Sequence, residues 1–188
     1  MDLSTSEGQK YRKVWGDAQY RVVSPGLRHL ESALAWMEPE PGASIADWGC
    51  GTGRAAEELD RRGFDVRLVD IAPNAYKGSL PFTQACLWEL PEELGPTDYG
   101  FCADVMEHIP TAHVDDVLAE IALRTRRKCF FQIALFHDLH FTHAGPLHLS
   151  VFPTEWWLER LLKAFGRLVR VHEIARKARM RHVLVVAE

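Results

Sequence analysis

The seven residues Asp47-Trp-Gly-Cys-Gly-Thr-Gly53 constrain the fold of this chain more than any other segment. Glycine occupies every second position behind the aspartate, directly after Ser44–Trp48, which reads as a short strand. Glycine tolerates positive φ and lets a ligand approach the backbone closely. A helix that begins here also presents free N–H groups at its N-terminus. This pattern is typical of a nucleotide-binding turn at the carboxyl end of a strand in an open α/β sheet.

The spacing of the glycines argues against two common nucleotide-binding motifs. The dinucleotide fingerprint G-x-G-x-x-G fits Gly49 and Gly51, but its third glycine falls on Arg54. The phosphate-binding loop G-x-x-x-x-G-K-[ST] needs a lysine that this turn lacks. Asp70 closes the next predicted strand, 65–69, and an acid at that position can accept hydrogen bonds from both hydroxyls of a ribose.

The rest of the chain alternates helix-like and strand-like segments, which predicts an α/β fold with a mostly parallel sheet. A helix is expected to begin at Ser24-Pro25 and to end before Pro39. Further helices are predicted at 53–62, 111–124 and 154–165. Strands are predicted at 44–48, 65–69, 83–87, 99–103, 129–135, 168–174 and 182–187.

Composition narrows the class of protein. The chain has 188 residues, of which 47% are hydrophobic and 26% charged, which suits one folded domain. No apolar run approaches the roughly 20 residues that span a bilayer, and the N-terminus lacks the apolar segment of a secretory signal, so we expect a cytoplasmic protein. The four cysteines form no CxxC pair and are predicted to be buried, reduced thiols: Cys50, Cys86, Cys102 and Cys129.

Four segments resemble, in order, the motifs of the class I S-adenosylmethionine-dependent methyltransferases: 45–53, 68–72, 84–91 and 101–110. The resemblance implies a Rossmann-like, doubly wound, mostly parallel seven-stranded sheet with helices on both faces and an antiparallel last strand. It also implies an enzyme that moves a methyl group from S-adenosyl-L-methionine to an acceptor by SN2 transfer, leaving S-adenosyl-L-homocysteine.

The same resemblance assigns roles to residues around the glycine turn. Asp47 is expected near the amino group of the cofactor's methionine part, and Asp104 near the same end. Asp70 is expected to hold the ribose, and Ile71 to pack on the adenine. The backbone of the turn would pass under the cofactor at Gly49, Cys50, Gly51 and Gly53.

Three neighbouring residues are assigned to the adenine, and one basic residue to the other end of the cofactor. Leu87 is expected to offer a backbone contact to the adenine ring, with Trp88 alongside. Cys86 stands where members of the family often carry an aspartate that accepts a hydrogen bond from the adenine, and cysteine replaces that acceptor poorly. Arg21, in an aromatic N-terminal segment, is a candidate partner for the cofactor carboxylate.

The sequence offers several candidate catalytic groups, although methyl transfer from an activated sulfonium mainly requires alignment. Glu107 and His108 directly follow Asp104. The predicted loop 136–152 carries four histidines, of which His148 and His143 are the candidates to contact the substrate or to act as a base. These histidines and Asp138 show no H-E-x-x-H spacing, so we expect no metal site. The alternative interpretation of the loop is a lid in which the four histidines have no chemical role.

The expected organisation is a single domain, 1–188. It would comprise a helical cap at 1–40, a cofactor-binding half at 44–135, a substrate loop at 136–152, and a helix with a terminal strand pair at 153–188. A small-molecule acceptor is favoured because no appended recognition domain is visible. The alternatives are an RNA or protein methyltransferase that uses the basic segments 124–128 and 167–182, or a non-catalytic cofactor-binding scaffold. Nucleic acid is not favoured at a net charge of −4, and the oligomeric state stays open.

Overall fold

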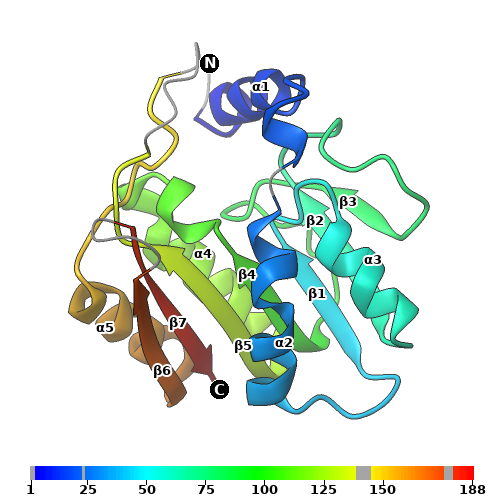
Figure 1. Ribbon diagram of the computed structural model, residues 1–188, viewed down its shortest axis with the longest axis vertical. Helices are drawn as coiled ribbons and strands as arrows, with labels where there is room; N and C mark the ends of the chain where they lie inside the picture. The colour runs from blue at the N-terminus through cyan, green and yellow to red at the C-terminus, as the bar shows by residue number, and fades with distance from the viewer. Residues whose placement is uncertain (1–2, 23, 139–144, 176–179) are drawn as a thin grey trace.

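The computed structural model describes residues 3–22, 24–138, 145–175 and 180–188. Its centre is one seven-stranded sheet with helices on both faces (Figure 1). The strand order is β3-β2-β1-β4-β5-β7-β6. Strands β1 to β5 pair in parallel, and β7 runs antiparallel to both β5 and β6, which confirms the predicted fold.

The strands follow the predicted segments closely, except that the third ends earlier than predicted and the fifth begins at Thr125 instead of residue 129. Their bounds are β1 Ser44–Trp48, β2 Asp65–Asp70, β3 Phe82–Gln84, β4 Thr97–Ala103, β5 Thr125–Ala134, β6 Leu168–Ala175 and β7 Arg181–Ala187. The prediction for the third strand, 83–87, is wrong at its carboxyl end. Because β2 ends at Asp70, which pairs with Gln84, the chain beyond Gln84 has no strand left to pair with. Residues 85–87 instead enter the loop that forms one wall of the site described below.

Two helices cover each face of the sheet. The α-helices are α1 Leu3–Val14, α2 Pro25–Met37, α3 Arg54–Arg61, α4 Val114–Leu123 and α5 Thr154–Phe165. Helices α2 and α3 share a buried cluster on one face, and α4 and α5 share another on the opposite face. Short 3-10 helices lie at Tyr20–Val22, Met106–His108 and Thr111–His113. The last of these is the start of the helix that was predicted from residue 111.

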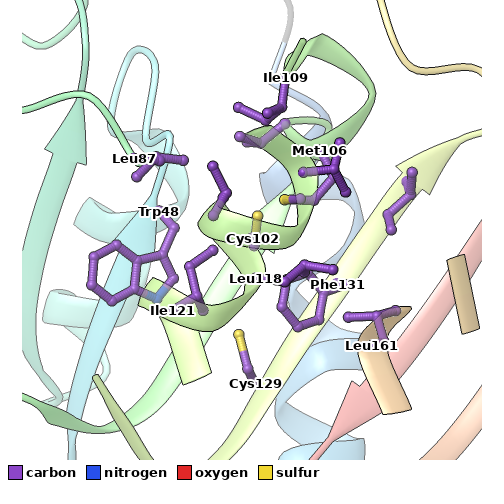
Figure 2. Packing of buried hydrophobic residues seen from close by; sticks show 14 of the residues in the cluster. Trp48, Leu87, Cys102, Met106, Ile109, Leu118, Ile121, Cys129, Phe131 and Leu161 are labelled. Atoms are coloured by element: carbon purple, nitrogen blue, oxygen red, sulfur yellow. The ribbon is translucent and has the colours of Figure 1, made fainter. Parts of the chain in front are cut away.

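Local features of the sequence explain why the helices could be predicted. Pro25 occupies the first turn of α2, where its missing N–H costs nothing, although the Ser24 side chain makes no capping bond. The apolar stripe of α2 then buries Leu30, Ala33 and Met37 against the sheet. On the other face, α4 and α5 pack over the central strands (Figure 2), and Leu118, Phe131 and Leu161 share that buried cluster.

Helix α1 lies apart from both layers, at the end of the sheet from which the glycine turn projects (Figure 1). No helix among the described residues is both long enough and apolar enough to cross a bilayer. Helices thus cover both faces of the sheet. The N-terminal segment covers the end of the sheet at which the parallel strands have their carboxyl termini.

Candidate active site

The carboxyl ends of the parallel strands and the N-terminal segment enclose two adjoining cavities. The larger has a volume of about 1050 Å³, and the smaller about 90 Å³. Five residues line both cavities: Trp15, Tyr20, Gly49, Asp104 and His108. The two cavities therefore form one site, divided by aromatic side chains of the N-terminal segment.

The glycine turn gives this site its floor. Gly49 has a φ of 74°, and a Cβ there would lie 2.6 Å from the Val105 side chain. Gly51 has a φ of 52°, and a Cβ there would lie 2.8 Å from the Trp15 indole. Both positions therefore combine a left-handed backbone with a close neighbour, which only glycine accommodates. Gly53 lines neither cavity: it caps α3 and packs against the Tyr76 ring.

Asp70 ties the glycine turn to the end of β2. Its Oδ2 accepts a hydrogen bond from the Gly51 N–H at 2.9 Å, and its Oδ1 accepts one from the Ala72 N–H at 2.9 Å. Burial raises the pKa of Asp70 to about 6, and the backbone hydrogen bonds oppose that rise. Each carboxylate oxygen offers roughly two lone pairs, so both oxygens keep capacity to accept from a ligand in the small cavity that Asp70 lines.

Asp47 is a buried carboxylate at the wall of the large cavity. Its side chain is 4% exposed, and its Oδ2 has no hydrogen-bond partner among the described residues. Burial, together with the charge of Asp70, raises the pKa of Asp47 to about 7. A buried carboxylate oxygen without a partner is costly, and a cationic ligand group in the cavity would relieve that cost.

The small cavity has the character of a site for a flat ring. Ile71, Cys86, Leu87 and Trp88 line it together with Asp70. The Trp88 indole stacks on the His113 ring, with centroids 4.8 Å apart and planes 12° from parallel. The structure thus brings the residues that the sequence assigned to adenine and ribose into one narrow cavity.

The N-terminal segment is fastened over the site by Arg21. One guanidinium nitrogen of Arg21 donates to the carbonyl oxygens of Trp15 (3.2 Å) and Asn74 (2.9 Å), and the other donates to that of Ala75 (2.9 Å). The Asn74 amide in turn donates to the Arg12 carbonyl at 2.9 Å. Arg21 does not line either cavity. Its expected pairing with the cofactor carboxylate therefore lacks geometric support, and we assign Arg21 as a tether between the cap and the loop after β2.

Asp104 stands at the end of β4 in a conformation that side chains rarely adopt. Its φ is 62°, one of only two positive values among the described non-glycine residues. Backbone strain of this kind persists where surrounding contacts hold it and is frequent at functional sites. Here the Asp104 N–H donates to the Gln132 carbonyl at 2.9 Å, and the Gln132 Nε2 donates to the Asp104 Oδ1 at 3.3 Å.

Beside Asp104, three of the sequence-predicted candidates come together. One ligand atom each from Glu107, His108 and His148 lies within 4.8 Å of the other two. The rings of His108 and His148 meet edge to face, with centroids 4.8 Å apart. His143, the fourth candidate, lies outside the described residues. His148 lies about 40 residues after Glu107 and His108 in the sequence. In the structure it lies beside them, next to the end of β4.

Backbone atoms hold each member of this group. The Ala134 N–H donates to the Glu107 Oε1 at 2.8 Å, while the Leu147 carbonyl lies 3.1 Å from the His108 Nδ1. The Phe136 carbonyl lies 2.6 Å from the His148 Nδ1. Burial and the neighbouring Asp104 raise the pKa of Glu107, and burial and His148 lower the pKa of His108 to about 4. Burial alone would raise the pKa of Asp104, but the charge of His108 and further contacts lower it.

Sequence reasoning missed Gln132 and His182, which also line the large cavity. Each is a polar residue inside an otherwise apolar strand, in CFFQIA and in HVLVVA, and each is buried. That interruption was the available signal, because a buried polar side chain must find a partner or face a site. Of the loop residues, Asp138 lines the cavity and His137 is exposed.

Comparisons with known proteins agree on one family. A family model described as a methyltransferase domain matches residues 45–128. The Mg-protoporphyrin O-methyltransferase of Rhodobacter capsulatus is 31% identical over 160 residues, which cover 78% of this chain and 65% of that protein. A ubiquinone biosynthesis O-methyltransferase of Xanthomonas axonopodis pv. citri is 30% identical over 92 residues, 43% of this chain and 38% of that protein. The chain thus spans less than two thirds of the length of either relative.

Solved structures show the same fold at lower identity. The 1,6-didemethyltoxoflavin-N1-methyltransferase of Burkholderia thailandensis, with bound S-adenosylhomocysteine, superposes with a TM-score of 0.75 at 19% identity, covering 100% of this chain and 90% of that one. The magnesium protoporphyrin IX methyltransferase of Synechocystis, with bound S-adenosylmethionine, gives 0.71 at 18% identity, covering 100% and 98%.

Proposed function

This chain belongs to the class I S-adenosylmethionine-dependent methyltransferase family, and from that premise we propose that it transfers a methyl group from S-adenosyl-L-methionine to a small-molecule acceptor. The observation that carries the proposal is the pair of buried carboxylates, Asp47 and Asp70, on either side of the glycine turn at the wall of one site. Asp47 has a carboxylate oxygen without a hydrogen-bond partner among the described residues, which suits the ammonium group of a ligand. Asp70 can accept further hydrogen bonds beside those from the backbone, which suits the hydroxyls of a ribose.

The described residues fit the cofactor at both of its ends. Asp47 would pair with its amino group, and Asp70 would accept from its ribose hydroxyls. Ile71, Leu87 and Trp88 would enclose the adenine in the small cavity. The cofactor, when bound, supplies a methyl group on a positively charged sulfur, and S-adenosyl-L-homocysteine remains after transfer.

Trp15 and Tyr20 stand in the way of this arrangement. The Trp15 indole lies over Gly51, where the glycine backbone would otherwise be open to a ligand. Trp15 also makes an edge-to-face contact with Tyr20, at a centroid distance of 4.9 Å. The proposal therefore requires the Trp15–Tyr20 pair to move aside when the cofactor enters, with the rest of the turn unchanged.

The size of the site supports a small acceptor. Sites for drug-sized ligands have volumes of about 300–1,000 Å³, and the large cavity alone reaches about 1050 Å³. That space suits an acceptor beside the methionine part of the cofactor, against Asp104, His108 and His148. The relatives named above methylate small molecules according to their names, among them a magnesium porphyrin and a ubiquinone precursor.

The basic segments offer little to an RNA or protein acceptor. In 124–128, Arg124 pairs with Glu120, Arg127 pairs with Glu40, and Lys128 donates to the Met37 carbonyl. In 167–182, Arg167 pairs with Glu188 and Arg181 with Glu173, while 176–179 lie outside the described residues. Acidic partners within the chain partly offset the charges of the basic residues named here, so we retain the macromolecular acceptor only as the second candidate. The cytoplasmic location and the single-domain boundaries stay predictions.

Calorimetric titration tests the proposal. S-adenosyl-L-methionine and S-adenosyl-L-homocysteine should each bind the wild type with one ligand per chain, and Asp70→Ala should lose measurable binding. Asp65→Ala is the matched control, because Asp65 is an exposed residue at the other end of the same strand. Absence of binding to folded wild type would refute the enzyme and leave the scaffold alternative. Binding without turnover in a broad screen of small acceptors would contradict the small-molecule assignment.

A further inference from the structure

The cluster of Glu107, His108 and His148 has the composition of a metal site. Two imidazoles and one carboxylate place a potential ligand atom each within 4.8 Å of the other two. Two ligands of one ion are at most about 4.2 Å apart at metal–ligand distances of about 2.1 Å. Three ligands spread around one ion at that distance lie about 3.4–3.6 Å apart, so side-chain shifts of up to about an ångström would bring all three onto one ion.

The hydrogen bonds around the cluster leave the three ligand atoms available. The Nδ1 atoms of His108 and His148 both face backbone carbonyl oxygens, which makes Nδ1 the protonated nitrogen and leaves the lone pair on Nε2. Glu107 uses Oε1 to accept from the Ala134 N–H, while no N–H group of the described residues donates to its Oε2, and the Asp104 carboxyl group lies within hydrogen-bonding reach of Glu107. Glu107 is 0% exposed, so two carboxyl groups share a buried position that a cation would stabilise.

This arrangement matches the support that proteins build around bound metals. A ligating histidine usually donates its second N–H to a carbonyl or carboxylate, and a ligating carboxylate is itself hydrogen-bonded. All three members of the cluster have that support from the backbone of the β5 end and the returning loop. The three orientations are thus held before any ion arrives.

We propose that Glu107, His108 and His148 bind a divalent first-row transition ion, with the Asp104 carboxyl group beside it. Imidazole nitrogens favour ions such as Zn²⁺, Mn²⁺ or Co²⁺ over Mg²⁺, which prefers oxygen ligands. His108 and His148 line the large cavity, so the ion faces the space assigned to the acceptor.

A metal ion at this position would favour acceptors that carry a hydroxyl group, an inference that rests on the proposed function. An oxygen-bearing acceptor, such as a phenol, can coordinate a cation at an open position, and a bound cation lowers the pKa of a coordinated hydroxyl. The coordinated hydroxyl would release its proton to solvent, and its oxygen would then form a bond to the methyl carbon as the bond from that carbon to the sulfonium sulfur breaks, leaving neutral S-adenosyl-L-homocysteine. Specificity for a hydroxyl acceptor follows without a protein side chain as the base.

Metal binding is measured on the full chain, stripped with a chelator and dialysed. Titration with Zn²⁺ should show one ion per chain, and Co²⁺ should give the visible absorption bands of a site with imidazole ligands. Zn²⁺ should bind at least about tenfold more tightly than Mg²⁺. His148→Gln and Glu107→Gln should each weaken Zn²⁺ binding by about tenfold or more. His172→Gln is the control, because His172 is an exposed histidine on β6.

Each outcome decides the proposal. His148→Gln changes a residue near the end of a loop, so it should remain folded even if the buried Glu107→Gln does not. A folded wild type that binds no Zn²⁺ or Co²⁺ would overturn the site, as would unchanged binding in His148→Gln or equal affinity for Mg²⁺. The cofactor titrations are separate: metal binding without cofactor binding would refute only the methyltransferase assignment, and the reverse result would refute only the metal site.

Discussion

Asp47 and Asp70 lie buried at the ends of the neighbouring strands β1 and β2, and the negative charge of Asp70 adds to burial in raising the pKa of Asp47 to about 7. A neighbouring negative charge disfavours the ionisation of a buried carboxyl group. A ligand that brings a positive group to Asp47 and hydroxyl donors to Asp70 would relieve both. The ligand-free protein should therefore be measurably destabilised by its own site once both groups are charged.

The first prediction concerns how the stability of the ligand-free protein depends on pH through Asp47 and Asp70. The unfolded pKa of aspartate is about 3.9, and the folded values are about 7 for Asp47 and about 6 for Asp70. Between the unfolded and folded pKa values, the folded state binds more protons than the unfolded state does. The stability that comes from protonated Asp47 and Asp70 is therefore fully present below about pH 4 and is lost as the pH rises through 6 to 7. Asp47→Asn should therefore be more stable than the wild type at pH 8, by a few kcal/mol at most.

Urea unfolding of both ligand-free proteins at pH 5 and pH 8 measures the difference. The gain in the variant should shrink towards pH 5, where most of the wild-type Asp47 already carries its proton. A variant that is less stable than the wild type at pH 8 would mean that Asp47 has a favourable partner in the folded protein. In the same range, the affinity of the wild type for S-adenosyl-L-methionine should rise with pH as Asp47 ionises.

The second prediction separates crowding from backbone strain at the glycine turn. Gly49 and Gly63 both have positive φ, at 74° and 89°. A Cβ at Gly49 would lie 2.6 Å from Val105, whereas a Cβ at Gly63 would have no neighbour within 4 Å. Strain should cost each alanine variant about 1–2 kcal/mol, and overpacking should add about 1–3 kcal/mol at Gly49 alone.

Denaturant midpoints of Gly49→Ala, Gly63→Ala and the wild type test this difference. Gly49→Ala should also weaken cofactor binding, because Val105 and the turn must shift to make room. Gly63→Ala should bind the cofactor like the wild type, since Gly63 lies at the far end of α3. Equal loss of unfolding free energy in both variants would show that the Val105 side chain moves away from a Cβ at position 49 without destabilising the protein.

The fold was predictable from sequence because its signals were local. The glycine turn, the apolar run Cys129–Leu135 and the stripe of 154–165 each specify an element within a few residues, and each element formed. The end of the third strand was not predictable in this way. Its length depends on where β2 stops, which is a property of the pairing partner and not of residues 85–87.

The site was predictable only in its parts. Glu107, His108 and His148 were each candidates, yet nothing in their spacing shows that a loop about 40 residues later returns to the end of β4. No metal site was expected because the loop histidines show no H-E-x-x-H spacing, and that criterion does not detect ligands that come from separate segments of the chain. Arg21 was assigned to the cofactor on charge, whereas its hydrogen bonds to three carbonyls depend on how the N-terminal segment crosses the loop after β2.

The third prediction concerns that tether. Arg21→Ala removes hydrogen bonds to the carbonyls of Trp15, Asn74 and Ala75, so the cap should open more often while the sheet remains intact. Chymotrypsin, which cuts after aromatic residues, should cleave the N-terminal segment faster in Arg21→Ala than in the wild type. Arg12→Ala is the control, because Arg12 contributes to the tether through its backbone carbonyl. Equal cleavage rates in all three proteins would assign the tether to other contacts.

The last prediction uses Trp15 as a reporter of cofactor entry. The indole lies over Gly51 in contact with Tyr20, and a ligand that follows the glycine backbone must displace it. Its surroundings then change, so the intrinsic fluorescence should shift on titration with S-adenosyl-L-homocysteine. Trp88, in the small cavity, adds to the signal, whereas Trp36 packs against Phe130 on another face of the fold. Trp15→Phe should therefore lose most of the shift, and Trp36→Phe should keep it. If Trp15→Phe retained the full shift while binding normally, the indole would not move, and the cofactor would have to approach the turn by a path that avoids Gly51.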